Sequence, residues 1–111
     1  MNICHIKCLP EKTKACCTKT KVTNLIQTAS CAKAEIELYE MQPSGYSPLH
    51  SHKMQHTILV LEGDGTVFDG EKALPLHPDD VVSIGANEKH QLKTLGKKPF
   101  RFLCVTTHVK E

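Results

Sequence analysis

Apolar and polar side chains alternate with a period of two along much of the chain, which is the pattern of half-buried β-strands. The clearest case is the run of residues 34–41. Because its acidic side chains cannot all be buried, we expect Ile36 and Leu38 to face an apolar layer. The opposite face then carries Glu35, Glu37, Tyr39 and Met41. In this position Glu37 is either solvated or lines a polar pocket.

The segments on either side of this run are less regular. Residues 10–21 predict a connector or a ragged edge strand, and residues 22–28 predict the first ordered strand. Residues 43–45 (Pro-Ser-Gly) are expected to break the long strand, because proline and glycine interrupt regular structure. Residues 57–61 are apolar at both parities, which predicts a strand covered on both faces.

Turn signals separate short strands at intervals of about eight to twelve residues in the second half of the chain. They lie at residues 62–65, 69–71, 78–80, 85–89 and 96–99. The first of these predicts a hairpin into the strand that follows it. The last precedes residues 100–107, where Phe100, Phe102, Cys104 and Thr106 share one parity and are expected to point inward. With no helical period, the pattern predicts an all-β antiparallel sandwich or barrel.

Length and charge describe a small domain with a basic leading segment. The chain has 111 residues, enough for one domain whose small core would gain from burial against a partner subunit. Residues 1–33 hold six Lys and one Glu, a net +5, and residues 34–111 hold eight Lys or Arg and eleven acids, a net −3. The basic segment has no aromatic residue for base stacking, so we interpret it as a solvated arm, with nucleic-acid contact as the alternative.

The cysteines are concentrated in the same segment. The N-terminus lacks the apolar core of a signal peptide, and no apolar run approaches the roughly 20 residues that span a bilayer. We therefore expect a cytoplasmic protein without a membrane partner. In that compartment we expect the thiols to be reduced. Five cysteines precede the long strand, namely Cys4, Cys8, Cys16, Cys17 and Cys31. A second metal site formed by Cys4, His5, Cys8, Cys16 and Cys17 is disfavoured, because the group lacks the paired Cys-x2-Cys knuckles of structural zinc sites.

Three histidines lie close together before the apolar run at residues 57–61. His50 and His52 are two residues apart, so in extended chain they project from the same face. His56 has the same parity and is separated from them by three residues that can form a bend. Converging neutral imidazoles suit a divalent transition metal such as manganese, iron, nickel, copper or zinc. The alternative is a polar cluster on a surface loop.

Two stretches carry a resemblance to the cupin superfamily. Residues 45–63 resemble its first motif, with Gly45, His50, His52 and Gly63 in place and His56 where a glutamate ligand is usual. Residues 80–91 resemble the second motif and end in His90. Here Asp79, Gly85 and Asn87 replace the usual glycine, proline and glycine. Aspartate and asparagine tolerate positive φ, so we expect both bends to survive.

The resemblance covers residues 34–107 and is strongest to small single-domain cupins with four histidine ligands, some of which bind manganese. It implies a double-stranded β-helix, or jelly roll, and usually a homodimer built by sheet packing. It also implies that His50, His52, His56 and His90 hold the metal, with manganese or iron preferred and nickel, copper or zinc as alternatives. We therefore divide the chain into an arm or edge strand at residues 1–21 and a cupin barrel at residues 22–111.

Three functions are compatible with such a site. The preferred one is a metal-dependent oxidoreductase, dioxygenase-like, that acts on a small organic molecule, with Cys104 among the pocket candidates. The second is a non-redox isomerase, epimerase or lyase acting on a sugar or small acid, in which Glu37 or Tyr39 carries protons. The third is a binding module that senses a small ligand or a metal without turnover. A closed tetrahedral zinc site would instead be structural.

Overall fold

The computed structural model of the chain describes residue 1, residues 3–26 and residues 34–108. Nine strands and one 3-10 turn make up this part: η1 (Ile6–Cys8), β1 (Glu11–Thr13), β2 (Thr18–Asn24), β3 (Ala34–Tyr46), β4 (Gln55–Glu62), β5 (Asp64–Phe68), β6 (Ala73–Leu76), β7 (Val81–Ile84), β8 (Gln91–Leu95) and β9 (Phe100–Thr107). The all-β prediction is confirmed, and every strand pairing is antiparallel. None of the described residues forms a helix long and apolar enough to cross a membrane.

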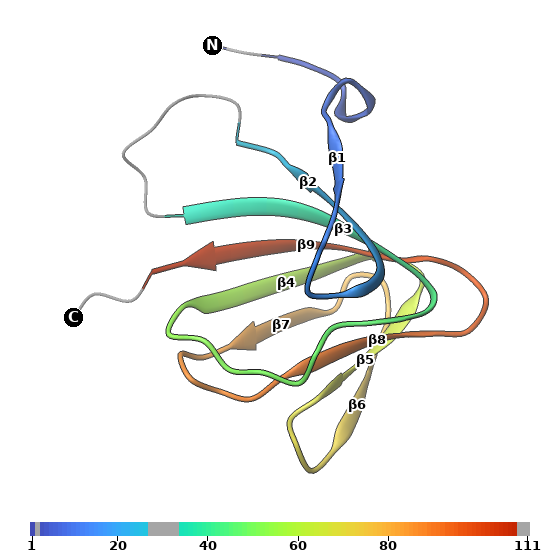
Figure 1. Cartoon of the computed structure of the whole chain (residues 1–111), viewed down its shortest axis with the longest axis vertical. Helices are drawn as coiled ribbons and strands as arrows, with labels where there is room; N and C mark the ends of the chain where they lie inside the picture. Colours follow the sequence, from blue (N-terminus) through green and yellow to red (C-terminus); the bar gives the residue numbers. More distant parts are fainter. Residues whose placement is uncertain (2, 27–33, 109–111) are drawn as a thin grey trace.

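The strands form one curled sheet with β3 at its centre (Figure 1). The order is β6-β5-β8-β3-β9-β4-β7, and β2 pairs with β3 while β1 pairs with β2. The first part of β3 lies against β9, whereas only its last residue, Tyr46, pairs with β8, at Lys93. The long strand therefore connects the two halves of the sheet, as expected of the predicted jelly roll.

The core lies between these two halves. Its cluster joins side chains from β6 and β8 on one side and from β3, β4, β7 and β9 on the other. These residues are Met41, Ile58, Val60, Leu76, Ile84, Leu92, Phe100, Phe102 and Cys104. The predicted inward parity of β9 is confirmed, because Phe100, Phe102, Cys104 and Thr106 are all buried. Phe100 and Phe102 are central core residues.

For β3 the two expected faces are present, but the face that carries the acidic residues is the one that lines the barrel interior. Met41 is fully buried in the core and Tyr39 packs against it, so the face that also bears Glu37 points into the barrel. Leu38 is buried on the opposite face, opposite Leu103 of β9, and belongs to a separate layer. Glu35 and Glu37 lie near one end of the strand, where the inward face opens into a cavity instead of dry core, which agrees with the second of the two positions expected for Glu37.

The expected break at residues 43–45 is absent, because β3 continues to Tyr46. The strand bulges instead: the ladder with β2 moves from Thr20 opposite Met41 to Thr18 opposite Tyr46. Ser44 adopts positive φ (64°) in this bulge and accepts a hydrogen bond from Lys19 at 2.8 Å. The proline and glycine therefore bend the strand without ending its pairing, as bulges do.

Two predictions about the apolar run at residues 57–61 are also wrong. In β4, Ile58 and Val60 are buried but Leu61 is 37% exposed, so only one face is covered within this chain. The link at residues 62–65 is not a hairpin, because β4 pairs with β7 and β9 whereas β5 pairs with β6 and β8. Gly63 makes this crossing with positive φ (73°), a conformation that favours glycine.

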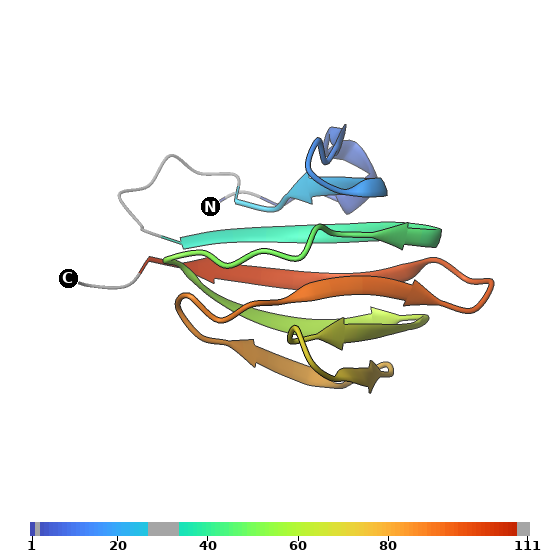
Figure 2. The same cartoon turned by 60° about the horizontal axis from the view of Figure 1, so that its bottom comes forward.

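The N-terminal segment adds to the sheet. Strand β2 begins at Thr18, four residues before the predicted start at Val22, and residues 27 and 28 lie outside the described residues. It pairs with β3 from Asn24 opposite Glu37 through Thr20 opposite Met41. Figure 2 shows this blue segment lying beyond β3, at the top of the view. The turn between β1 and β2 is thereby held close to the barrel.

Candidate metal centre

The loop after β3 and the loop before β8 meet at one end of the barrel. Ser47 donates its backbone N–H to the Leu92 carbonyl at 2.9 Å, and its side-chain oxygen accepts the Leu92 N–H at 2.8 Å. Three residues later, His50 and His90 exchange two backbone hydrogen bonds of 3.2 and 2.9 Å. This isolated bridge fixes the two histidines side by side, although they are far apart in the sequence.

Three imidazoles converge there. One ligand nitrogen each from His50, His52 and His90 lies within 4.8 Å of the other two. The Nε2 atoms of His50 and His52 are only 3.0 Å apart. Two metal–nitrogen bonds of about 2.0–2.1 Å place their nitrogens about 2.9 Å apart at a right angle and about 3.3 Å apart at a tetrahedral angle. The nitrogens of His50 and His52 are therefore close enough to bind one ion together.

His56 lies on β4 beside this group, with its ring centre 5.2 Å from that of His52 and 5.4 Å from that of His90. Its Nδ1 is 3.0 Å from the hydroxyl oxygen of Thr106 on β9. Within the described part of the chain, its buried Nε2 has no hydrogen-bond partner. A buried imidazole nitrogen without a partner is costly unless something binds it, so this atom fits the role of fourth ligand.

The backbone fixes the tautomer of His90. Its Nδ1 lies 2.9 Å from the carbonyl oxygen of Glu88, and a carbonyl can only accept, so Nδ1 carries the hydrogen. The lone pair of Nε2 is then free for a metal. Asn87, which stands where a glycine is usual in the second motif, adopts φ 65°, and Asp79 adopts φ 74°, so both bends survive as predicted.

Burial favours the neutral form of His50, His52 and His56, whose pKa values are lowered. Burial lowers the pKa of His50 to about 4, and the nearby His52 and His90 lower it further. Burial also lowers the pKa of His56 to about 4, followed by the effects of the other three histidines. The pKa of His52 is lowered for the same reasons, burial first and then His90. Neutral imidazole is the form that binds metal, so the site is ready for a cation near neutral pH.

The histidines open into a cavity of about 160 Å³. Its lining, besides the four histidines, consists of Lys14, Cys16, Cys17, Glu35, Glu37, Tyr39, Ser47, Met54, Ile58, Ile84, Leu92, Phe102, Cys104 and Thr106. An apolar cavity of about 150 Å³ holds a benzene-sized molecule, so a small organic ligand fits beside the histidines. A cavity next to the ligand atoms distinguishes this centre from a closed structural zinc site.

The three predicted pocket residues all line this cavity. Tyr39 stacks on Phe102 with ring centres 5.0 Å apart, and Lys14 lies 5.6 Å from its ring centre. Burial raises the pKa of Tyr39 well above its usual range, with a further contribution from Glu37, so Tyr39 stays a phenol. Burial also raises the pKa of Cys104, which keeps this residue a thiol 3.7 Å from His56 Nδ1.

The cavity also includes residues that the sequence did not single out as part of this site. Lys14, Cys16 and Cys17 come from the turn between β1 and β2, which the interpretation of residues 1–21 as an arm kept apart from the site. The adjacent cysteines can be recognised in the sequence. Their position beside the cavity cannot be predicted from the sequence, because it depends on how β2 pairs with β3.

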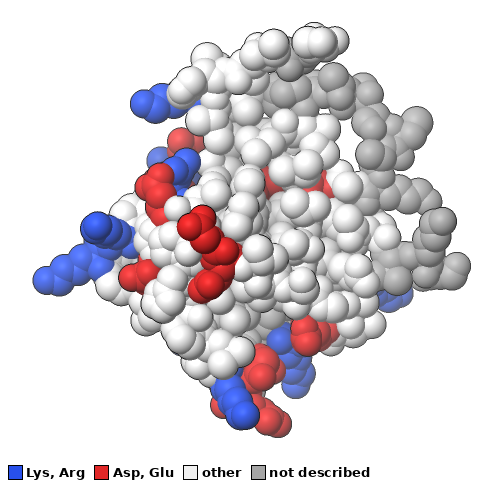
Figure 3. Space-filling view, turned by 180° about the vertical axis from the view of Figure 1, so that it is seen from behind, with Lys and Arg blue, Asp and Glu red and all other residues white. Residues whose placement is uncertain are grey.

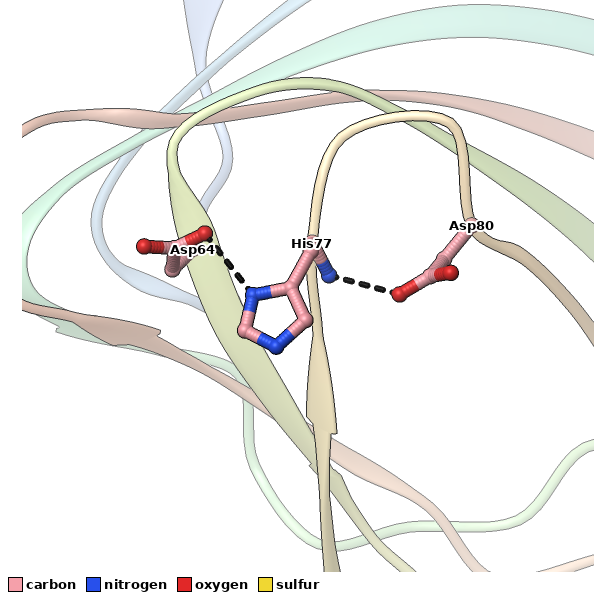
Figure 4. A network of polar contacts seen from close by, with 3 residues as sticks. All are labelled: Asp64, His77 and Asp80. Atoms are coloured by element: carbon pink, nitrogen blue, oxygen red, sulfur yellow. Dashed lines mark hydrogen bonds and ion pairs between the residues drawn. The ribbon is translucent and has the colours of Figure 1, made fainter.

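The remaining polar candidates lie outside the centre. Among the described residues, the group of three or more potential ligands is the histidine group, and it includes no cysteine. Cys4 and Cys8 are exposed, and Cys31 lies outside the described residues. His77 is exposed and joins a turn: its ring contacts Asp64 at 3.0 Å and its backbone N–H donates to Asp80 at 2.7 Å (Figure 4).

Charged side chains of both signs are visible on one face of the molecule. In Figure 3, which views the molecule from behind, Lys and Arg side chains lie mostly at the borders of the visible face, and acidic side chains lie both at the borders and within its left half. Along these borders Lys and Arg side chains alternate with acidic ones. This face therefore lacks the continuous basic surface that phosphate backbones require.

A family model described as the cupin domain matches residues 37–106, which contain all four histidines and both motifs. The chain is 30% identical over 71 residues to 1-methylthio-D-xylulose 5-phosphate methylsulfurylase of Rhodospirillum rubrum, covering 64% of this chain and 46% of that protein. It is 26% identical over 82 residues to auxin-binding protein 1 of Arabidopsis thaliana, covering 66% of this chain and 41% of that protein. The chain thus spans less than half the length of these curated relatives.

Among solved structures, the fold is similar to that of the polyketide cyclase RemF from Streptomyces resistomycificus. The TM-score is 0.88 with 25% sequence identity, and the match covers 96% of this chain and 79% of that one. The coverage of this chain includes most of the segment before the matched cupin domain. The three named proteins carry out different activities, so the shared fold does not by itself specify a reaction.

Proposed function

We propose that this chain, which belongs to the cupin family, is a metal-dependent oxidoreductase that acts with dioxygen on a small, largely apolar organic molecule. The four histidines would hold a divalent transition metal, manganese or iron in the first place. The observation that carries the proposal is the unpartnered, buried Nε2 of His56 beside the converging nitrogens of His50, His52 and His90. These four donors border a cavity that has room for a substrate.

The composition of the cavity supports an apolar substrate. Ile58, Ile84, Leu92 and Phe102 line it together with the histidines, and they exclude water from one side. When bound, a redox-active divalent ion would supply Lewis acidity and electron exchange with dioxygen. The chain's own residues would hold and orient the substrate: Phe102 and Tyr39 offer a flat apolar wall, and the Tyr39 phenol can donate a hydrogen bond.

A non-redox reaction is the second candidate, and one observation favours it. Glu37 and Tyr39 both line the cavity, so a carboxylate and a phenol lie near any bound substrate. Two proteins similar to this chain are enzymes by name, a polyketide cyclase and a methylsulfurylase of a sugar phosphate. In this version Glu37 would take a proton from one substrate atom and return it to another, while the Tyr39 phenol would donate a hydrogen bond to the substrate. The neutral, apolar part of the lining is less suited to a sugar phosphate, and we therefore place this candidate second.

The deciding experiment combines metal analysis with oxygen uptake. The untagged protein would be purified without chelator, its metals measured per chain, and oxygen consumption followed with small enols, keto acids and thiols. We expect near-stoichiometric manganese or iron and oxygen uptake with at least one substrate class, lost in His52→Ala. His77→Ala is the matched control, because His77 is exposed and lies outside the centre.

Other results would lead to other functions. Turnover that is equally fast without oxygen and is lost in Glu37→Gln would favour the non-redox reaction. Stoichiometric metal with tight ligand binding but no turnover would favour a binding module, a role that the name of auxin-binding protein 1 also suggests for a relative. Zinc alone, with no substrate effect in any assay, would contradict the oxidoreductase.

The homodimer expected from the sequence is also proposed, and the outer face of the sheet supports it. Leu59 of β4 lies between Leu103 of β9 and Val81 of β7, and Val81 is 63% exposed. Such a row of apolar side chains on neighbouring strands is typical of sheet-to-sheet packing. Val81→Lys should yield a monomer in light scattering, whereas Leu74→Lys, at an exposed site on β6, should not. A dimer that survives Val81→Lys would contradict this interface.

A further inference from the structure

Two adjacent thiols lie at the edge of the histidine cavity. The Sγ atoms of Cys16 and Cys17 are 3.7 Å apart, and both residues line the cavity. Cys16 is exposed and Cys17 is half-buried, so the pair can be reached from solvent. The proposed oxidoreductase chemistry does not use either thiol.

The turn that carries these thiols is held by backbone hydrogen bonds. Lys14 donates its N–H to the Thr20 carbonyl at 3.0 Å, and Cys17 donates its N–H to the Lys14 carbonyl at 3.0 Å. The flanking strands are paired, with Thr13 opposite Lys21. The two sulfurs are therefore presented by a closed turn at the end of a strand pair.

We propose that Cys16 and Cys17 form a dithiolate site for a thiophilic divalent cation, such as Zn²⁺ or Cd²⁺, separate from the histidine centre. The spacing of the sulfurs carries this proposal. Two zinc–sulfur bonds of about 2.3 Å at a tetrahedral angle place the sulfurs about 3.8 Å apart. The observed 3.7 Å needs almost no rearrangement.

A disulfide is the obvious alternative use of two adjacent cysteines, and the geometry disfavours it. Disulfides usually join residues whose Cα atoms are about 4.4–6.8 Å apart, whereas neighbouring residues joined by a trans peptide are about 3.8 Å apart. Forming the bond would also need the sulfurs to approach to about 2.0 Å from 3.7 Å. An ion that bridges the sulfurs avoids both changes.

The remaining ligands of such an ion would be water. Among the described residues, no carboxylate forms a group of potential ligands with the two sulfurs, although Glu35 and Glu37 line the same cavity. Burial raises the pKa of Cys17 to about 12, so this thiol is protonated when the site is empty. Binding must then release protons, as is general for thiolate sites. Thiolate donors are also soft, which suits them to thiophilic ions such as Zn²⁺ and Cd²⁺.

Cadmium provides a probe that reports on sulfur alone. Titrating the reduced, full-length protein with Cd²⁺ while recording ultraviolet absorption measures the thiolate-to-metal charge-transfer band, which imidazole ligands do not produce. We expect this band to saturate at one Cd²⁺ per chain. In the double variant Cys16→Ser/Cys17→Ser, the Cd²⁺ affinity obtained from this band should fall by more than about 100-fold, since both sulfur ligands are removed.

Two controls separate this site from the others. Cys4→Ser/Cys8→Ser removes two exposed thiols and should leave the band and its affinity unchanged. His52→Ala should also leave the band in place, because the proposal assigns the histidines to a different ion. The His52→Ala control keeps the test independent of the proposed function, since the absorption band does not require an active histidine centre.

Several outcomes would overturn the proposal. A band that persists in Cys16→Ser/Cys17→Ser would come from Cys104 or from other thiols, and a band lost in Cys4→Ser/Cys8→Ser would place the site elsewhere. A band lost in His52→Ala would mean that thiols and histidines share one ion. If the double variant failed to fold, the single Cys16→Ser change at an exposed residue would give the same test.

Discussion

His56 and Thr106 lie on neighbouring strands, and the Nδ1 atom of His56 is 3.0 Å from the Thr106 hydroxyl oxygen. In the metal-binding tautomer Nδ1 carries the hydrogen and donates it to this oxygen. The lone pair of the buried Nε2 is then available on the side of the other histidines. One hydroxyl on β9 thus decides whether the fourth imidazole is ready to bind a metal.

Removing that hydroxyl should weaken the metal centre. Thr106→Val keeps the shape of the side chain but leaves His56 Nδ1 without its acceptor, and we expect metal affinity to fall about 10–100-fold. Thr106→Ser keeps the hydroxyl and should stay close to wild type. Competition with a chelator of known affinity measures both variants. Equal affinities for the valine and serine variants would show that Thr106 does not orient His56.

Replacing a metal-binding histidine should reduce the metal content more than it affects folding. His52→Ala is expected to reduce bound metal to well below one ion per chain, while far-ultraviolet circular dichroism stays unchanged. The reason is that the core cluster contains none of the histidines. His77→Ala should keep full metal content. Unfolding of His52→Ala at room temperature would mean that the ion is needed for the structure, as in a structural zinc site.

The metal-free protein should lose stability as the solution becomes acidic. The pKa of His50 and of His56 is lowered to about 4 in the folded state, from a usual 6.5. Between these values the unfolded chain binds protons that the folded chain does not, so stability rises with pH. The contribution is fully present above about pH 6.5 and is lost as the pH falls toward 4.

This dependence is measured as the melting temperature in the presence of chelator between pH 7 and pH 4. The double variant His50→Gln/His56→Gln should show a smaller decrease over this range, because glutamine does not titrate. Carboxylates contribute a remaining slope in both proteins. Identical slopes would show that the imidazoles titrate normally when no metal is bound.

The packing of Gly65 against Phe100 predicts a change in stability far from the metal. A Cβ at residue 65 would lie 2.6 and 2.7 Å from two ring carbons of Phe100, which is fully buried. We expect Gly65→Ala to cost about 1–3 kcal/mol through overpacking. At Gly85 a Cβ would meet no atom within 4 Å, so Gly85→Ala should stay within about 0.5 kcal/mol. Urea unfolding measures both, and equal midpoints would contradict this packing argument.

Local patterns predicted much of the fold and of the metal centre. Strand β9 was predicted with the bounds and the inward face that the structure has, because an alternating strand between clear turns needs no distant information. The convergence of His50 and His52 followed from their spacing in extended chain. His56 followed from its matching parity after a short bend. Only for His90 was the resemblance to a family needed, since its place beside the other three depends on how the turn before β8 is positioned.

Other features could not be read locally. The alternation in β3 was visible, but which of its two faces lines the barrel interior depends on what packs there: Tyr39 and Met41 pack in the core cluster, whereas Leu38 is buried on the opposite face. The link after β4 had the composition of a hairpin and yet joins strands that pair with different partners. The composition of a turn indicates that the chain changes direction. Which strand then lies beside the next one depends on strand pairing across the whole sheet.

The sequence by itself determined that this chain is built of strands, that its histidines can meet, and that its turns tolerate positive φ at Asp79 and Asn87. These properties depend on the parity and the backbone preferences of neighbouring residues. Only the tertiary structure decided that Cys16 and Cys17 border the histidine cavity and that the Thr106 hydroxyl lies within hydrogen-bond distance of His56. Both relations join segments far apart in the chain, and they arise because β2 and β9 pair with β3 and β4 in one curled sheet.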